Sequence, residues 1–173
     1  MFEKFRQRSY ELENLDKGTY TPAEYEGCIV ELQRVNQWLG DAKALRGSLL
    51  KVIEQQDLRS FSVLDVGAGS GELLRVTAKW ARETNRAASL VGLELNERSS
   101  RAILEESRDF PEISAVQADG LALPFPNACF DYVIQSLTLH HFDGAGARNL
   151  RNRSASQSGR LLFLYHRRPA ISS

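Results

Sequence analysis

The sequence predicts an α/β protein with a mostly parallel sheet and helices on both faces. Short apolar segments alternate with amphipathic ones from residue 61 onward, at the spacing of strand–helix units. The apolar segments are nearly continuous in Val, Ile, Leu and Phe, which is typical of strands covered on both faces. A glycine-rich stretch directly follows the first of these segments, where such a sheet places a turn into a helix.

The segment before residue 57 is predicted to be helical. Thr21-Pro-Ala-Glu24 forms a capping box with proline at the first helical position, and Gly40 can end that helix. Asp41 can cap a second helix. The second helix has an apolar face at helical spacing, made of Leu45, Leu49, Val52 and Ile53. We therefore expect residues 1–56 to form a helical extension.

Residues 57–173 contain the alternating elements. The predicted strands are FSVLDV (61–66), SLVGLEL (89–95), ISAVQA (113–118), CFDYVIQSL (129–137) and LLFLY (161–165). The predicted helices between the first three strands are 71–83, with Leu73, Leu74, Val76 and Ala78 available to face the sheet, and 96–108, with Asn96 as its N-cap.

Three glycines follow the first predicted strand, in the segment VLDVGAGSGELL. Gly67, Gly69 and Gly71 have the spacing G-x-G-x-G, whereas dinucleotide-binding proteins use G-x-G-x-x-G. Asp65 stands two residues before the loop, and its charge opposes a pyrophosphate at close range. The same carboxylate favours a ligand with an ammonium and a sulfonium, and S-adenosylmethionine has both and no phosphate. The alternative is a purely structural turn, since tight turns also need glycine.

Acids also follow the next two predicted strands. Glu94 lies about 20 residues beyond the loop, where α/β nucleotide sites place an acid that binds ribose hydroxyls. Leu95 can pack on an adenine face, and Asp119, followed by Gly120, can accept from the adenine amine. The carboxyl ends of parallel strands share one edge, so Asp65, Glu94 and Asp119 are expected to line one crevice. The ordinary alternatives are a solvated turn residue for Glu94 and a turn cap for Asp119.

Together these motifs resemble those of class I S-adenosylmethionine-dependent methyltransferases. VLDVGAGSG resembles the first motif of that family, VGLELN its ribose-binding acid, and ADGLALPFPNACFDYVIQSLTLHHF the later run of many small-molecule methyltransferases. The earlier segment ELQRVNQWLG resembles the helical lid of some members. Asn127 is a departure, because the family often has an acid there.

The resemblance implies a Rossmann-like fold, S-adenosylmethionine as cofactor, a small-molecule methyl acceptor and no metal. The cofactor-binding residues that it implies are Asp65, Gly67, Gly69, Gly71, Glu94, Leu95, Asp119, Gly120, Gln135 and Ser136.

Methyl transfer is an in-line displacement, so the protein mainly has to align acceptor and methyl. An oxygen or nitrogen acceptor can also need a base. His140 and His141 follow the fourth predicted strand, at the mouth of the crevice, and imidazole titrates near neutral pH. They are the candidate catalytic residues, with structural packing as the alternative.

The chain ends soon after the fifth predicted strand, whereas the resemblance implies seven strands, the last two as an antiparallel pair. The Arg/Ser-rich segment 148–160 offers few apolar residues to a helix that must cover a sheet. We therefore expect a lid at 1–56 and a methyltransferase domain at 57–173 that is incomplete at its C-terminus. The exposed edge of the fifth strand favours self-association. The alternative function is a truncated or inactive homologue that binds the cofactor without turnover.

Composition excludes several classes of protein. Of 173 residues, 42% are hydrophobic and 25% charged, with zero net charge, so a nucleic-acid-binding function is not favoured. No apolar run approaches the roughly 20 residues that span a bilayer, and the first residues lack the apolar core of a secretory signal. Cys28 and Cys129 lie in no disulfide or zinc pattern, so we expect them to be buried. A cytoplasmic location is predicted.

Overall fold

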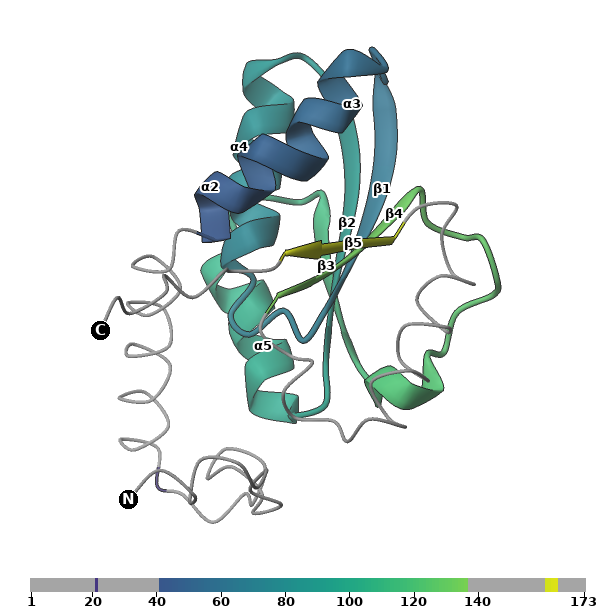
Figure 1. Ribbon diagram of the computed structural model, residues 1–173. Helices are drawn as coiled ribbons and strands as arrows, with labels where there is room; N and C mark the ends of the chain where they lie inside the picture. The colour runs from purple at the N-terminus through teal and green to yellow at the C-terminus, as the bar shows by residue number, and fades with distance from the viewer. Residues whose placement is uncertain (1–20, 22–40, 137–160, 165–173) are drawn as a thin grey trace, which may run out of the picture.

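The sheet has the predicted architecture. The computed structural model describes residues 41–136 and 161–164, together with Thr21. The described elements are α2 (Asp41–Leu45), η2 (Arg46–Leu50), α3 (Lys51–Gln55), β1 (Ser60–Val66), α4 (Glu72–Glu83), β2 (Ala87–Glu94), α5 (Glu97–Glu106), β3 (Ile113–Gln117), η3 (Gly120–Ala122), β4 (Tyr132–Ser136) and β5 (Leu161–Leu164). The strand order is β3-β2-β1-β4-β5, and every neighbouring pair is parallel. The α/β class and parallel sheet are thus confirmed (Figure 1). Helices on both faces of the sheet stay a prediction, because the buried apolar residues of the described helices α2 to α5 all belong to one hydrophobic cluster on one face.

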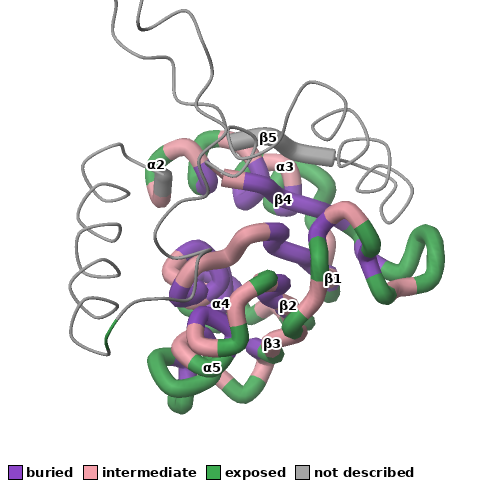
Figure 2. The backbone as a smooth tube through the Cα atoms, turned by 90° about the horizontal axis from the view of Figure 1, so that it is seen from below, coloured by how far each residue is buried: buried purple, intermediate pink, exposed green. Residues whose placement is uncertain are grey.

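Side chains of β1 alternate between the two faces of the sheet, as in any strand. Phe61 and Val63 belong to one hydrophobic cluster, and Leu64 and Val66 belong to a second. Both sets are buried, and in Figure 2 the buried positions of β1 lie in the interior of the described chain. Burial on both faces explains why the strand segments read as nearly continuous apolar runs.

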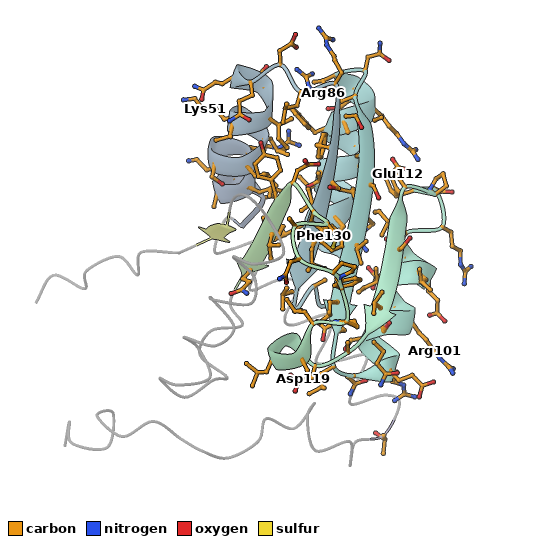
Figure 3. All side chains as sticks on the ribbon, turned by 90° about the vertical axis from the view of Figure 1, so that its right-hand side faces the viewer. Lys51, Arg86, Arg101, Glu112, Asp119 and Phe130 are labelled. Carbon is orange, nitrogen blue, oxygen red and sulfur yellow. The ribbon has the colours of Figure 1, made fainter. Side chains whose placement is uncertain are left out.

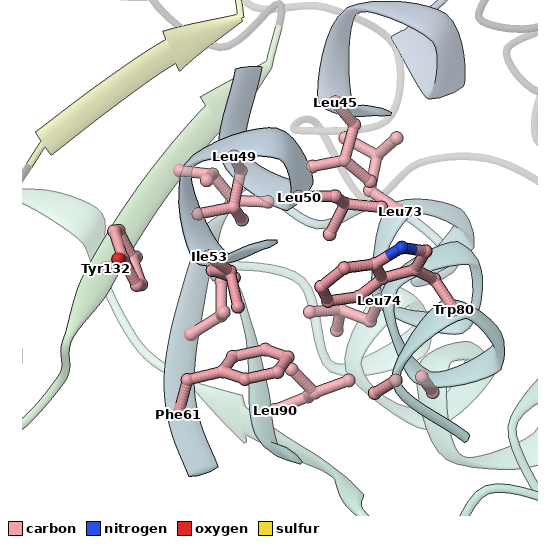
Figure 4. Close-up of a cluster of buried hydrophobic side chains, with 14 of the residues drawn as sticks. Leu45, Leu49, Leu50, Ile53, Phe61, Leu73, Leu74, Trp80, Leu90 and Tyr132 are labelled. Atoms are coloured by element: carbon pink, nitrogen blue, oxygen red, sulfur yellow. The ribbon is translucent and has the colours of Figure 1, made fainter. Parts of the chain in front are cut away.

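The first cluster contains residues of the sheet and of the helices α2 to α5, and these helices lie on one side of the sheet in Figure 1. Trp80 of α4 packs against Phe61 with the ring centroids 6.1 Å apart. Leu74 of α4, Leu90 of β2 and Ile103 of α5 are completely buried in the same cluster. Figure 4 shows side chains of the helices and of the sheet meeting in this cluster.

Residues 41–55 form three consecutive helical segments, of which η2 is π-helical. The predicted apolar face is observed, with Leu45, Leu49 and Ile53 fully buried and Val52 half-buried, and Leu50 adds to it. This part of the predicted extension therefore shares its core with the sheet. The division of the chain at residue 56 stays a prediction, and residues 22–40 lie outside the described residues.

In the described chain, the second face of the sheet is covered by the segment between β3 and β4. Leu123 and Phe130 of this segment pack on Leu64, Val66, Leu93 and Val133. Phe125 meets Phe130 edge-on, with the ring centroids 5.1 Å apart. The poor helix suggested by residues 148–160 lies outside the described residues.

Polar contacts fix the end of the sheet where the strands begin. One carboxylate oxygen of Asp131, just before β4, accepts from the Ser62 amide at 2.7 Å and from its hydroxyl at 2.8 Å. The Asp131 amide donates in return to the Ser62 hydroxyl at 3.0 Å. On the same half of the sheet, Arg82 of α4 binds both carboxylate oxygens of Glu112, just before β3. These contacts join segments that are far apart in the sequence.

The predicted burial of Cys129 is wrong, because this side chain is exposed. It lies in the turn before β4, where Ala128 has a positive φ of 57° and the chain bends at the surface. Partial desolvation still raises the pKa of the Cys129 thiol, which disfavours the thiolate. Cys28 lies outside the described residues. Among the helices that the structure describes, none has the length and apolar character needed to cross a bilayer.

Candidate functional site

The glycine loop joins β1 to α4 in a conformation that requires glycine. Gly67, Gly69 and Gly71 have φ of 76°, 59° and 82°, in the left-handed region that other residues rarely adopt. Gly71 is also the N-cap of α4. The amides of Gly67 and Ala68 both donate to the Leu93 carbonyl of β2, at 2.9 and 3.3 Å. The loop is therefore fixed against the end of β2.

Glu94 brings three strand ends together. Its side-chain Oε1 accepts from the Gly69 amide at 2.5 Å, and its backbone carbonyl accepts from the Ala118 amide at 2.9 Å. The first bond reaches the loop after β1, and the second reaches the residue after β3. The predicted convergence of the loop with the acid of β2 is thus observed, with Glu94 half-buried rather than in a solvated turn.

Asp65 lies in the middle of this edge. It pairs with Gly92 on β2 and with Ile134 on β4, and it is only 2% exposed. Gln135, also 2% exposed, and the half-buried Ser136 end the neighbouring β4. The implied cofactor-binding residues of β1 and β4 therefore lie on adjacent strands at the same end of the sheet.

A pocket of about 260 Å³ opens beside the ends of β2 and β3. Its lining residues are Leu95, Asn96, Glu97 and Gln117. Leu95 is 60% exposed, and its apolar side chain offers a surface on which a flat ring can pack. Gln117 donates to the Leu95 carbonyl at 3.2 Å, and Asn96 caps α5 by accepting from the Arg98 amide. Sequence reasoning predicted Asn96 only as a helix cap and missed Asn96, Glu97 and Gln117 as lining residues.

Asp119 acts as a cap, which was the alternative to cofactor binding considered for it. Its carboxylate accepts from the Leu121 amide at 2.8 Å and so caps η3, while Gly120 is buried beneath it. Figure 3 shows Asp119 at the same end of the molecule as Arg101 of α5, opposite Arg86. Asp119 is exposed and lies just beyond β3, so its binding of adenine stays a prediction.

The candidate bases, His140 and His141, lie outside the described residues. Within the described part of the chain, no three His, Cys, Asp or Glu side chains are grouped as a metal site.

The geometry fits an adenosyl sulfonium ligand. A Cβ built on Gly69 meets no atom within 4 Å, so the loop presents bare backbone to open space, where a ligand can approach closely. The acids at this edge, Asp65 and Glu94, suit ammonium and hydroxyl groups better than phosphates. The apolar face of Leu95 suits a purine.

Comparison with known proteins gives the family. The methyltransferase domain profile matches residues 63–155, more than half of the chain. The ubiquinone/menaquinone biosynthesis C-methyltransferase UbiE of Yersinia enterocolitica is 33% identical over 117 residues, which are 65% of this chain and 45% of that protein. The chain thus spans about half the length of the curated relatives it matches.

Solved structures share the fold. A SAM-dependent methyltransferase from Aquifex aeolicus superposes with a TM-score of 0.57 at 17% identity, over 81% of this chain and 68% of that one. The [4+2]-cyclase SpnF superposes with a TM-score of 0.51 at 16% identity, over 58% and 36%. A cyclase with this fold shows that the fold alone does not determine the reaction. On the domain match, with the glycine loop and the acid of β2 in place, the protein belongs to the class I S-adenosylmethionine-dependent methyltransferases.

Proposed function

We propose that the protein transfers a methyl group from S-adenosylmethionine to a small organic acceptor. The observation that supports this most is the bond between Glu94 and the Gly69 amide. It joins the bare glycine loop to the acid of β2, and Leu95 directly follows that acid in the sequence. The methyltransferase names of the domain and of the UbiE relatives support the same reaction.

Each residue of this edge has a distinct part in the proposal. The bound cofactor supplies a methyl group on a positively charged sulfur. Asp65 attracts the ammonium group and Glu94 accepts from the ribose hydroxyls, because both are carboxylates beside the open loop. Leu95 packs on the adenine, and Gly69 allows close approach. Gln135 and Ser136 lie beside the methionine part.

The proposal extends to the methyl acceptor and to the base that would deprotonate it. His140 and His141 are proposed as bases for an acceptor that must lose a proton. The UbiE relatives are named for C-methylation in quinone biosynthesis, so electron-rich aromatic rings are the first acceptors to screen. A cytoplasmic location remains a prediction from composition.

Calorimetry with S-adenosylmethionine, S-adenosylhomocysteine and NAD tests the cofactor. We expect the first two to bind and NAD not to bind, since the loop spacing and Asp65 oppose a pyrophosphate. Transfer of a labelled methyl group to a panel of phenols, hydroquinones and amines then tests the reaction. Cofactor binding without transfer to any member would favour the alternative of a binding protein without turnover.

A further inference from the structure

Arg75 connects the glycine loop to the end of α5. It lies in the first half of α4, and its side chain is 18% exposed. One terminal nitrogen, Nη1, donates to the Ser70 carbonyl at 2.5 Å. The other, Nη2, donates to Oε2 of Glu106 at 2.9 Å, and Glu106 is the last residue of α5. One guanidinium therefore bridges the loop after β1 and the helix after β2.

The bond to Ser70 fixes a peptide that would otherwise turn easily. Gly69 and Gly71 flank Ser70, and both have positive φ. Glycine adopts positive and negative φ about equally readily, so a peptide next to it can rotate at low cost. The peptide between Ser70 and Gly71 is held at its N–H, which donates to the Ala68 carbonyl at 2.9 Å. Arg75 holds its carbonyl, by a charge-assisted bond that is stronger than a neutral one.

Two acids of the β2–α5 unit thus hold the loop, one directly and one through Arg75. Glu94, at the end of β2, accepts from the Gly69 amide. Glu106, at the end of α5, orients the guanidinium that binds the carbonyl of the next residue, Ser70. The same unit supplies the pocket residues Leu95 and Glu97. The bridge therefore couples the loop to the helix that follows the adenine pocket.

The guanidinium of Arg75 also lies close to Gly71. A Cβ built on Gly71 would lie 3.5 Å from Nη1 of Arg75 and 3.1 Å from Cγ2 of Ile103. The guanidinium thus lies directly against the loop, on the side packed on α5. Its removal would leave the loop unsupported there and the Ser70 carbonyl without this bond.

We propose that Arg75 is a positioning residue for the cofactor, which keeps the Ser70–Gly71 peptide in its binding orientation and is itself oriented by Glu106. This role rests on the proposed function, since it assumes that the glycine loop binds S-adenosylmethionine. Arg75 does not itself touch the cofactor in this proposal.

The test compares Arg75→Met with Arg82→Met, a matched control on the same helix. Arg82 also binds one carbonyl, that of Asp109, and one glutamate, Glu112, but near the start of β3. Both substitutions keep an unbranched apolar side chain. Each removes the hydrogen bonds to a backbone carbonyl and to a glutamate. Calorimetry measures the dissociation constant of S-adenosylmethionine well below the melting temperature of each variant. Amide hydrogen exchange of residues 67–71 is measured on the ligand-free proteins.

We expect Arg75→Met to weaken binding about tenfold, which corresponds to about 1.4 kcal/mol, and to speed exchange in the loop. Arg82→Met should lower the melting temperature but leave both readouts unchanged. Arg75→Lys and Glu106→Gln retain part of the bridge, so their affinity for S-adenosylmethionine and their loop exchange should fall between those of wild type and Arg75→Met. These two variants provide the test if Arg75→Met does not fold.

Wild-type affinity in Arg75→Met, or an equal loss in Arg82→Met, would overturn the positioning role. If the wild-type chain does not bind S-adenosylmethionine, the proposed function fails instead. Hydrogen exchange then still decides whether Arg75 orders the loop, because that readout needs no ligand. Unchanged exchange in Arg75→Met would reject the role even so.

Discussion

At the scale of single residues, Glu94 has two functions that ordinarily belong to different side chains. Its carboxylate accepts from the Gly69 amide and so orders the loop, and in the proposed function it also accepts from the ribose. A carboxylate has two oxygens and about four acceptor positions, so both functions are compatible. Substitutions at this position have to separate them.

We predict that Glu94→Ala weakens S-adenosylmethionine binding by about 1.5–3 kcal/mol, the range for hydrogen bonds to a charged group. Glu94→Gln keeps an oxygen that can accept from the Gly69 amide, so it should lose less. Glu105→Ala removes an exposed acid of α5 and should change nothing. Calorimetry measures all three, and wild-type affinity in a folded Glu94→Ala protein would remove Glu94 from the site.

Gly69→Ala tests the open side of the loop. The left-handed φ of 59° makes alanine unfavourable by about 1–2 kcal/mol, and the new methyl group points into the space left for the ligand. We expect a loss of stability and a larger loss of cofactor affinity. Asn85→Ala is the control, because Asn85 has a similar φ of 54° in the turn after α4. It should lose stability alone, and tight binding by Gly69→Ala would show that the loop is only a turn.

At the scale of elements, the contact between Arg82 and Glu112 ties α4 to the start of β3. The hydrogen bond from Arg82 holds the pKa of Glu112 below its ordinary value, although desolvation opposes it. The same bond raises the pKa of Arg82, which stays protonated. The guanidinium also lies 4.7 Å from the centroid of the Phe110 ring. A carboxyl group with a lowered folded-state pKa stabilises the fold only when ionised.

We therefore predict that Glu112→Gln reduces the free energy of unfolding near neutral pH and has a shrinking effect as the pH falls. The stabilisation is complete above the pKa of glutamate in the unfolded chain, and it is lost as the pH falls through the lower folded-state pKa. Urea denaturation of both proteins across the acidic range measures this. A difference between them that stays constant with pH would mean that the ion pair does not stabilise the fold.

The elements were predictable because their signals are local. Asn96 caps α5 as predicted, and the glycines have the left-handed φ that their spacing suggested. The fourth strand begins later than predicted, since a turn at residues 127–128 and a single bridge at Phe130 precede Tyr132. A continuous apolar run did not reveal that turn, and the same turn exposes Cys129.

The contacts that organise the site were less predictable, because they depend on side chains that meet only in the folded chain. Arg75 reads as one more polar residue of an amphipathic helix, although it bridges residues 70 and 106. Gly92 gave a signal that could have been used, since glycine inside a strand often marks close packing. A Cβ there would lie 2.8 Å from Ile103 and 2.9 Å from Leu74.

At the scale of the whole molecule, residues 41–55 share one core with the sheet. Leu49 is completely buried in the cluster that contains Phe61 and Tyr132 (Figure 4). A core shared in this way is expected to unfold together with the sheet. The helices that precede the sheet then contribute to the stability of the whole domain, in addition to covering one face of the sheet.

We predict that Leu49→Ala lowers the free energy of unfolding by about 2–5 kcal/mol, the range for leucine truncations in a core. Lys51→Ala, at an exposed position two residues further along the chain, should change it by less than about 0.5 kcal/mol. Urea denaturation followed by circular dichroism and by tryptophan fluorescence should give one coincident transition. Separate transitions, with the second unaffected by Leu49→Ala, would show that the helices fold independently.

The clasp between Ser62 and Asp131 has a consequence at the opposite end of the sheet. It joins residues that are 69 positions apart in the sequence, at the start of β1 and β4. If β4 slipped by one residue along β1, its side chains would exchange faces, and Gln135 and Ser136 would no longer point where they do now. The clasp has partners for its three hydrogen bonds in one alignment only. The contact therefore favours the alignment of β1 and β4 that places Gln135 and Ser136 at the opposite end of their strand.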